Sequence, residues 1–80
     1  MTVTVRLFAY YAEKLGATEL TLDLADGSTV ADALRVVGSL PGGSHLPPSP
    51  LVAINLSYAR PASTLNRGDE LAIIPPVAGG

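Results

Sequence analysis

Apolar residues occupy every second position in two stretches near the start of the chain, residues 3–7 and 20–24. A period of two is typical of strands that bury one face and expose the other. Two later stretches, residues 51–56 and 70–75, are rich in apolar residues and also predict strands. We therefore expect four main strands and a short edge strand at residues 59–60, where the following proline ends pairing.

A helical repeat covers residues 30–37, where apolar side chains are spaced by three and four. This spacing places them on one face of a helix. Thr29 and Asp32 resemble a capping box at its start, with aspartate in place of the usual glutamate or glutamine. We expect Gly38 to end this helix, and residues 10–16 are compatible with a second, shorter helix that also ends at a glycine.

Turn-forming residues separate the predicted elements. Ser57 and Tyr58 indicate a turn after the third strand, and residues 64–69 indicate a single turn followed by a tight bend. Residues 39–50 contain four prolines and two glycines, which disfavour a regular element. We therefore expect that stretch to be a surface loop.

The order of the elements predicts an α+β fold in which one mixed sheet packs on the main helix. A right-handed crossover through that helix makes the first and last strands parallel neighbours in the centre of the sheet. Eighty residues leave room for a single domain, residues 1–80. Within it we expect residues 75–80 to form a flexible tail.

Composition excludes several classes of function. A net charge of −2 is too acidic for a nucleic-acid-binding protein, which needs a basic surface. No stretch is long and apolar enough for a membrane span, and the alternating N-terminus is not a secretory signal, so we expect a cytoplasmic protein. The absence of cysteine excludes disulfides and thiolate chemistry. The single histidine, His45, falls in the proline-rich loop as a solvated residue, which argues against an enzyme that acts alone.

Three apolar residues, Phe8, Ala72 and Ile74, fall on the outward phase of the first and last strands. The helix covers one face of the sheet, so the other face should be polar. Scattered apolar surface residues are common, whereas a contiguous patch marks a partner-binding site. Because the two strands are expected to be adjacent, we favour a patch at which a larger protein docks and receives the tail.

The chain ends with two prolines, Val77, Ala78 and two glycines. Prolines end strand pairing and favour an extended exit from the sheet. The last four residues span roughly 13–14 Å when extended, which is enough to enter the active site of another protein. Gly79 and Gly80 have no Cβ, so the backbone can pass through a narrow channel.

The carboxylate of Gly80 gives this tail a chemical role. It is ionised at neutral pH and can attack the α-phosphate of ATP, after which a sulfur nucleophile can displace AMP from the acyl-adenylate. A terminal Gly-Gly alone would also fit an end without function. Its direct connection to a strand through two prolines favours a functional tail.

Several motifs together carry a resemblance to a known family. A Gly-Asp-Glu turn at residues 68–70 is followed by the pattern Pro-Pro-Val-x-Gly-Gly at residues 75–80. Weaker matches lie at residues 6–9, 27–30 and 52–55. These residues resemble the MoaD-type sulfur carriers, the small subunits of molybdopterin synthase, and the resemblance spans the chain.

The resemblance implies a ubiquitin-like β-grasp fold and a chain that binds no cofactor itself. It implies that a ubiquitin-activating-type adenylyltransferase uses ATP and Mg²⁺ to adenylate Gly80, and that a sulfur donor, a sulfurtransferase, converts it to a thiocarboxylate. The large subunit of molybdopterin synthase would accept the tail in a heterotetramer of two small and two large subunits. Sulfur from two carriers would pass to cyclic pyranopterin monophosphate and form the dithiolene of molybdopterin.

The resemblance also identifies functional residues. Gly79 and Gly80 would present the transferred group, and Phe8 and Ile74 match partner-facing positions of the family. The full set of expected partner contacts is Phe8, Ala72, Ile74, Pro75, Pro76, Val77 and Ala78.

Two features depart from the family pattern. Ala12 stands where many members have arginine, which removes one expected polar contact with a partner. The loop at residues 39–50 is unusually rich in proline and has no assigned role.

Other functions share the same chemistry or fold. A thiocarboxylate carrier can serve thiamine thiazole formation, tRNA thiolation or cysteine synthesis. A ubiquitin-like modifier would be joined to target lysines through Gly80, although the single lysine, Lys14, argues against chain building. A plain binding module would need no tail chemistry at all.

Overall fold

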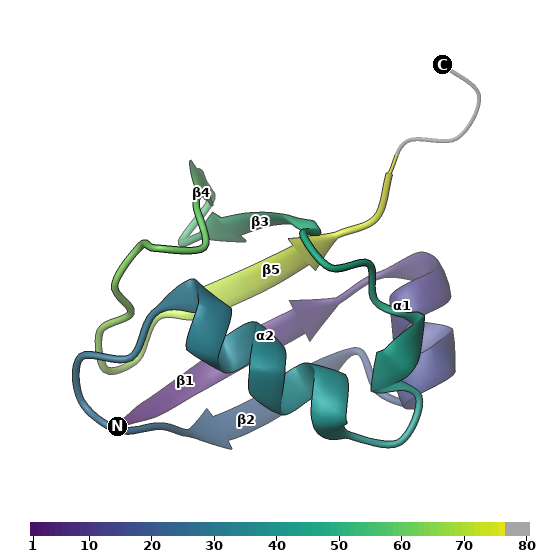
Figure 1. Cartoon of the computed structure of the whole chain (residues 1–80), viewed down its shortest axis with the longest axis horizontal. Coiled ribbons are helices and arrows are strands. Elements are labelled where there is room, and N and C mark those ends of the chain that lie inside the picture. Colours follow the sequence, from purple (N-terminus) through teal and green to yellow (C-terminus); the bar gives the residue numbers. More distant parts are fainter. Residues whose placement is uncertain (77–80) are drawn as a thin grey trace.

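The structure is a computed structural model that describes residues 1–76. Strands and helices follow one another along the chain in the order that Figure 1 shows. The elements are β1 (Thr2–Leu7), α1 (Ala9–Leu15), β2 (Glu19–Asp23), α2 (Val30–Ser39), the 3₁₀ turn η1 (Gly43–His45), β3 (Leu51–Ile54), β4 (Ser57–Ala59) and β5 (Glu70–Ile74).

The strands of the described part form one mixed sheet in the order β2-β1-β5-β3-β4. β1 and β5 are parallel, with Val5 opposite Leu71, and every other pairing is antiparallel. The predicted parallel pairing of the first and last strands is therefore confirmed, as is the α+β class. The last strand leads directly out of the sheet at the end where β1 also finishes.

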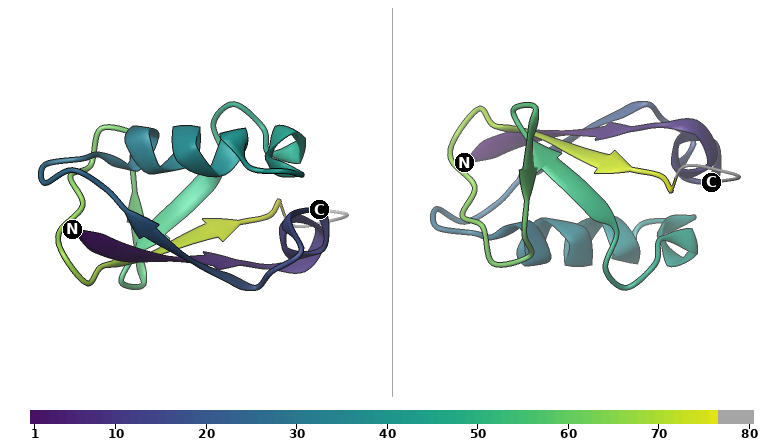
Figure 2. Two further views of the ribbon diagram at one scale, coloured as in Figure 1. Left: turned by 90° about the horizontal axis from the view of Figure 1, so that it is seen from below. Right: turned by 90° about the horizontal axis from the view of Figure 1, so that it is seen from above.

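The two faces of the sheet are covered differently. Both views of Figure 2 show α2 lying across one face, while no helix of residues 1–76 covers the opposite face. The core lies between α2 and the sheet and takes one phase of β1, β2, β3 and β5. Its buried residues are Val3, Val5, Leu7, Tyr11, Leu22, Leu24, Val30, Ala33, Val37, Val52, Leu65, Leu71 and Ile73.

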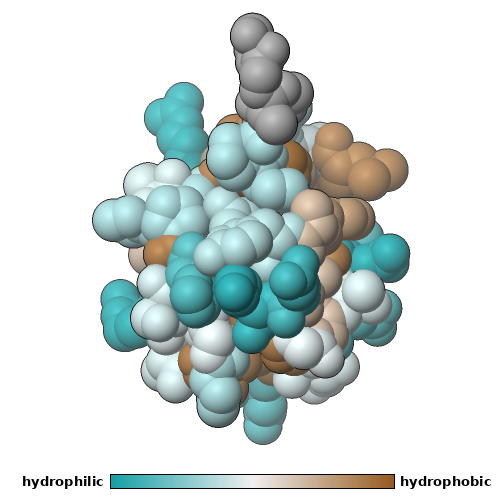
Figure 3. Space-filling view, turned by 90° about the vertical axis from the view of Figure 1, so that its right-hand side faces the viewer, coloured by the Kyte–Doolittle hydropathy of each residue, from teal (hydrophilic) through white to brown (hydrophobic). Residues whose placement is uncertain are grey.

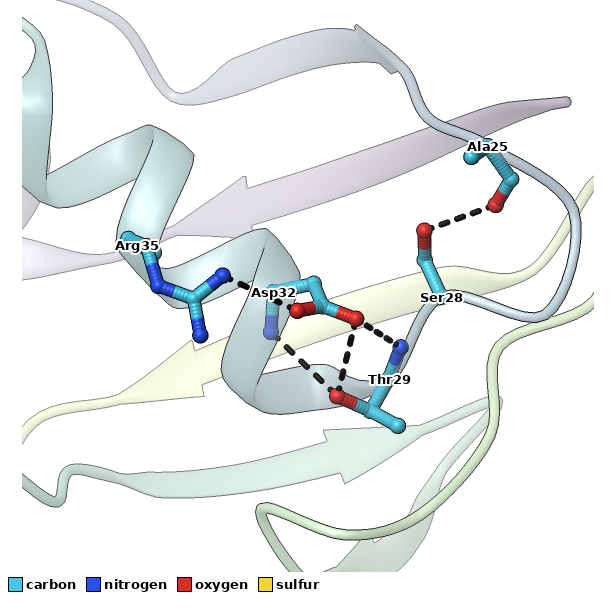
Figure 4. Close-up of polar contacts among 5 residues, drawn as sticks. All are labelled: Ala25, Ser28, Thr29, Asp32 and Arg35. Atoms are coloured by element: carbon cyan, nitrogen blue, oxygen red, sulfur yellow. Dashed lines mark hydrogen bonds and ion pairs between the residues drawn. The ribbon is translucent and has the colours of Figure 1, made fainter.

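The capping box predicted at the start of α2 is present (Figure 4). The Thr29 backbone amide donates to Asp32 Oδ2 at 2.9 Å, and the Asp32 amide donates to Thr29 Oγ1 at 3.3 Å. Arg35 Nη1 donates to Asp32 Oδ1 at 2.9 Å. The Thr29 amide first, then the Arg35 guanidinium and the Thr29 hydroxyl, lower the pKa of Asp32 below its usual value of 3.8. These bonds favour the carboxylate and so fix the start of the helix.

Three details of the sequence prediction are wrong. α2 does not end at Gly38 but continues to Ser39. The loop at residues 39–50 is not entirely irregular, because η1 forms within it. The hairpin turn after β3 lies at Asn55 and Leu56, two residues earlier than predicted, so Tyr58 belongs to β4.

Two glycines explain why the proline-rich loop can pack closely against both helices. Gly42 has a φ of +87°, and a Cβ there would collide with the carbonyl oxygen of Lys14 in α1. A Cβ on Gly43 would collide with the carbonyl oxygen of Val37 in α2. The loop is therefore held against the helices by backbone contacts that only glycine permits.

Among the described residues, no helix has the length and apolar character that crossing a membrane requires.

Candidate functional site

The open face of the sheet, the one without a helix, carries apolar side chains over β5. Along this strand Leu71 and Ile73 point into the core and are 0% exposed. Ala72 and Ile74 lie on the other phase and are half-buried on the open face. Phe8, the residue after β1, is 42% exposed. The structure brings these last three residues to one groove, as their phase in the sequence predicts.

Neighbouring strands extend this apolar surface beyond the three predicted residues. The register places Ala53 of β3 opposite Ala72, and Tyr58 of β4 opposite Ala53. Opposite residues in an antiparallel pair share a face, so all three lie on the open face. We name the groove of about 330 Å³ that they help to form the docking groove, which is lined by Phe8, Ala53, Leu56, Tyr58, Glu70, Ala72 and Ile74.

Sequence reasoning missed the contribution of β3 and β4 to this groove. The turn was placed too late, which assigned Leu56 to a strand and Tyr58 to a turn. The period-two phase of β3 carried a signal, because Ala53 alternates with core-facing Val52. That signal becomes useful only once the register between β3 and β5 is known.

The other half of the open face is polar. Thr4 of β1 stands opposite Thr21 of β2, and Arg6 stands opposite Glu19. At the border with the docking groove, Arg6 Nη1 lies 3.7 Å from Glu70 Oε2. Both of these side chains are partly exposed, so the ion pair contributes little stability. It does give the apolar half of the face a defined edge.

A hydrogen-bond network holds the β3–β4 turn against the start of β5. Asn55 Nδ2 donates to Asp69 Oδ1 at 2.9 Å, and the Glu70 amide donates to Asn55 Oδ1 at 2.9 Å. The Asn55 amide donates to the Glu70 carbonyl oxygen at 2.9 Å. Asp69 is buried, and its Oδ2 accepts from the Asn66 amide at 2.7 Å. The Gly-Asp-Glu turn therefore sets the position of the hairpin that borders the docking groove.

The tail leaves the sheet at the far end of the docking groove. β5 ends at Ile74, and Pro75 and Pro76, which have no N–H, follow it. On the helix side these prolines join a second apolar groove, of about 480 Å³. We name it the tail-root groove, and it is lined by Ala9, Tyr10, Tyr11, His45, Pro47, Pro75 and Pro76.

His45 is exposed, as the sequence predicted, and it also makes a contact that the sequence did not predict. Its Nδ1 lies 3.1 Å from the Tyr10 hydroxyl oxygen, and the two rings meet edge to face. Lys14 Nζ lies 5.2 Å from the centre of the Tyr10 ring on α1. Apolar surface lies beside the point where the described chain ends, as Figure 3 shows. The tail root is thus bordered by apolar side chains on both sides of the sheet.

Val77, Ala78, Gly79 and Gly80, four of the predicted functional residues, lie outside the described residues. Within residues 1–76, no group of three His, Cys, Asp or Glu side chains could hold a metal ion. His45 pairs with a tyrosine, not with the serine and carboxylate of a triad.

A family model described as the ThiS family matches residues 5–80, nearly the whole chain. The chain belongs to the ThiS family. A relative from Chlamydomonas reinhardtii, named molybdopterin synthase sulfur carrier subunit, is 36% identical over 83 residues and covers 100% of both chains. Its name confirms the family resemblance found in the sequence. It also agrees with the expectation of a carrier subunit that does not catalyse alone.

Similar solved structures confirm the ubiquitin-like β-grasp fold. SAMP1 from Haloferax volcanii matches with a TM-score of 0.84 and 32% identity over 100% of both chains. One subunit in a complex of subunits 1 and 2 of molybdopterin-converting factor from Helicobacter pylori matches with a TM-score of 0.74 over 100% of both chains. At 20% identity, the second match shows the fold alone.

Proposed function

We propose that this ThiS-family chain is the sulfur carrier subunit of molybdopterin synthase and that Gly80 carries the sulfur as a thiocarboxylate. The observation that carries the proposal is the continuity between the docking groove and the root of the tail on one strand, β5. A protein bound at Phe8 and Ile74 is placed where it can receive the residues that follow Pro76. The full-length similarity to a sulfur carrier subunit supports the same reading.

The chemistry at Gly80 proceeds in three steps on partner proteins. The carboxylate attacks the α-phosphate of ATP, with Mg²⁺ bound by the partner, and pyrophosphate leaves. The terminal sulfur of a persulfide on a sulfurtransferase then attacks the acyl carbon, and AMP leaves. A thiol cleaves the resulting acyl disulfide, which releases the thiocarboxylate and leaves a disulfide on the donor side. This chain contributes the carboxylate and the slim Gly79-Gly80 backbone, whereas ATP and Mg²⁺ belong to a ubiquitin-activating-type adenylyltransferase.

The large subunit of molybdopterin synthase is the proposed acceptor of the loaded tail. The Chlamydomonas reinhardtii relative, 36% identical over 83 residues, is named as a subunit of molybdopterin synthase, which supports such a partner. In this proposal the docking groove binds the large subunit, and Pro75 to Ala78 lead the thiocarboxylate to its active site. Sulfur from two carriers then passes to cyclic pyranopterin monophosphate. The catalytic side chains belong to the large subunit.

Intact mass spectrometry tests the carrier role directly. The full chain is incubated with ATP, Mg²⁺, the adenylyltransferase and a sulfur donor. We expect the mass gain that corresponds to replacement of one oxygen by sulfur, located at Gly80 by fragmentation. A variant that lacks Gly79 and Gly80 is the matched control and should show no gain. If the full chain gains no sulfur while a known carrier does in the same mixture, the proposal is wrong.

A second candidate function is protein modification through Gly80. The similarity to SAMP1, a small archaeal modifier protein, at 32% identity favours it. The same adenylate would then be attacked by a target lysine, which forms an isopeptide bond and releases AMP. Affinity purification of the tagged chain from cells, followed by peptide mass spectrometry, would reveal isopeptide-linked targets. Their absence in cells that produce molybdopterin would leave sulfur transfer as the function.

A further inference from the structure

The turn between β3 and β4 places a leucine where the backbone favours glycine. Asn55 and Leu56 form a two-residue turn, since Ile54 pairs with Ser57. Their φ angles are +48° and +73°. Positive φ at both central positions defines a type I′ turn, in which Asn-Gly is the favoured pair. Asparagine tolerates this region, but the Cβ of leucine meets the following carbonyl oxygen there.

Leu56 gains nothing in the isolated chain to offset this strain. Its side chain is 96% exposed, the highest value among the exposed large hydrophobic residues of the described chain. An exposed leucine buries no apolar area and therefore adds no hydrophobic stabilisation. The turn requires the positive φ but not the leucine, so a strained, exposed leucine at this position points to a role in function.

The structure also holds Leu56 in a fixed position. The preceding residue, Asn55, is bonded to Asp69 and to both the amide and the carbonyl of Glu70. Leu56 therefore lines the docking groove at the start of β5, and Ile74 lies four residues further along that strand. Four steps along a strand span about 13 Å. The groove thus has an apolar residue at each end, one of them beside the tail root.

We propose that Leu56 is an anchor residue that inserts into an apolar pocket of the large subunit of molybdopterin synthase. This inference rests on the proposed function. The partner would then contact the groove at two points, Leu56 at one end and the pair Phe8 and Ile74 at the other. Two contacts fix both the position and the direction of β5 on the partner. The large subunit is the proposed occupant because Leu56 lines the same groove as Phe8 and Ile74, at which the proposed function places that subunit.

The variant Leu56→Gly separates this role from a structural one. Glycine relieves the strain of the left-handed backbone and so stabilises the folded chain. The greater conformational freedom of glycine in the unfolded chain offsets part of this gain. We therefore expect the melting temperature to rise by about 2–6 °C. Loss of the anchor should weaken the affinity for the purified large subunit by about 10–30-fold. A structural residue would not move these two quantities in opposite directions. Leu56→Met keeps an apolar side chain of similar volume and should bind close to wild type.

The double variant Phe8→Glu with Ile74→Glu distinguishes failure of this inference from failure of the proposed function. If it loses affinity for the large subunit while Leu56→Gly keeps it, the anchor is wrong and the docking groove stands. If neither variant loses affinity, the proposed docking itself is wrong. A fall in melting temperature for Leu56→Gly would also overturn the anchor. The anchor would also be overturned if Leu56→Gly slowed ATP-dependent adenylation but left the affinity for the large subunit unchanged.

Discussion

The two faces of β5 carry the same kinds of apolar side chain but in different roles. On the helix side, Leu71 and Ile73 are fully buried and hold the sheet against α2. On the open side, Ala72 and Ile74 are half-buried and lie in a groove that no described element covers. Apolar residues on the first side are explained by folding. Those on the second side remain partly exposed in the isolated chain, and we propose that they bind a partner.

The difference teaches that stability and binding can be changed separately along one strand. Substitutions on the buried side should act on the free energy of unfolding. Substitutions on the open side should act on the affinity for a partner. The following predictions test this separation, from the largest expected change in stability to the smallest.

Ile73→Ala and Ile74→Ala form a matched pair on adjacent positions of β5. Ile73→Ala removes buried volume and should lower the free energy of unfolding by about 2–5 kcal/mol. Ile74→Ala should lower it by less than about 1.5 kcal/mol, yet weaken binding to the large subunit. Urea denaturation and titration calorimetry measure the two effects. Equal destabilisation by both variants would show that the open side is also part of the core.

Gly42→Ala tests whether the proline-rich loop is held against α1 by close backbone contact. The new Cβ would meet the Lys14 carbonyl oxygen at a positive φ, so we expect a loss of about 1–3 kcal/mol in unfolding free energy. Gly27→Ala is the matched control, because its φ of +86° is similar but its surroundings are open. It should show only the backbone cost. A similar loss in both variants would exclude the contact as the cause.

Thr29→Ala should act on the fold alone. It removes the hydroxyl that accepts the Asp32 amide at the start of α2, so we expect a loss of about 1 kcal/mol in unfolding free energy. The capping box lies on the helix side of the sheet, away from the docking groove. Affinity for the large subunit should therefore stay at the wild-type value. If the fully folded Thr29→Ala variant bound the large subunit more weakly than wild type, the helix face and the open face of the sheet would be coupled.

The pH dependence of stability gives the smallest effect. The folded state holds the pKa of Asp32 below 3.8, so the carboxylate contributes stability that is fully present above that value. This contribution disappears as the pH falls through the lower pKa of the folded chain. The difference in unfolding free energy between wild type and Asp32→Asn should therefore shrink on acidification. Urea denaturation between about pH 2 and pH 6 measures it. A difference that does not change with pH would contradict the assignment.

Local patterns in the sequence predicted the elements and three residues of the docking groove. Alternation gave the buried phase of β1 and β5, and the spacing of Thr29 and Asp32 gave the cap of α2. Phe8, Ala72 and Ile74 followed from that same phase, because a period of two assigns each residue to a face. Each of these features depends on residues close together in the sequence, so it can be read from one sequence alone.

Features that depend on distant contacts could not be predicted. The Asn55-Leu56 turn lacks the glycine that usually marks a type I′ turn, and the Asn55–Asp69 bond that holds it joins residues fourteen apart in sequence. The Tyr10–His45 contact likewise depends on how the loop packs on α1. Both features require the tertiary fold, and the second forms part of the tail-root groove.

Binding of the thiocarboxylated chain to the large subunit tests the central claim most directly. The dissociation constant is measured for wild type and for Phe8→Glu with Ile74→Glu, after both are shown to melt at similar temperatures. If the open side of β5 is the docking surface for the sulfur-bearing tail, the double variant should bind at least about 30-fold more weakly and transfer its sulfur correspondingly slowly. Unchanged affinity in a folded, loaded double variant would contradict the account.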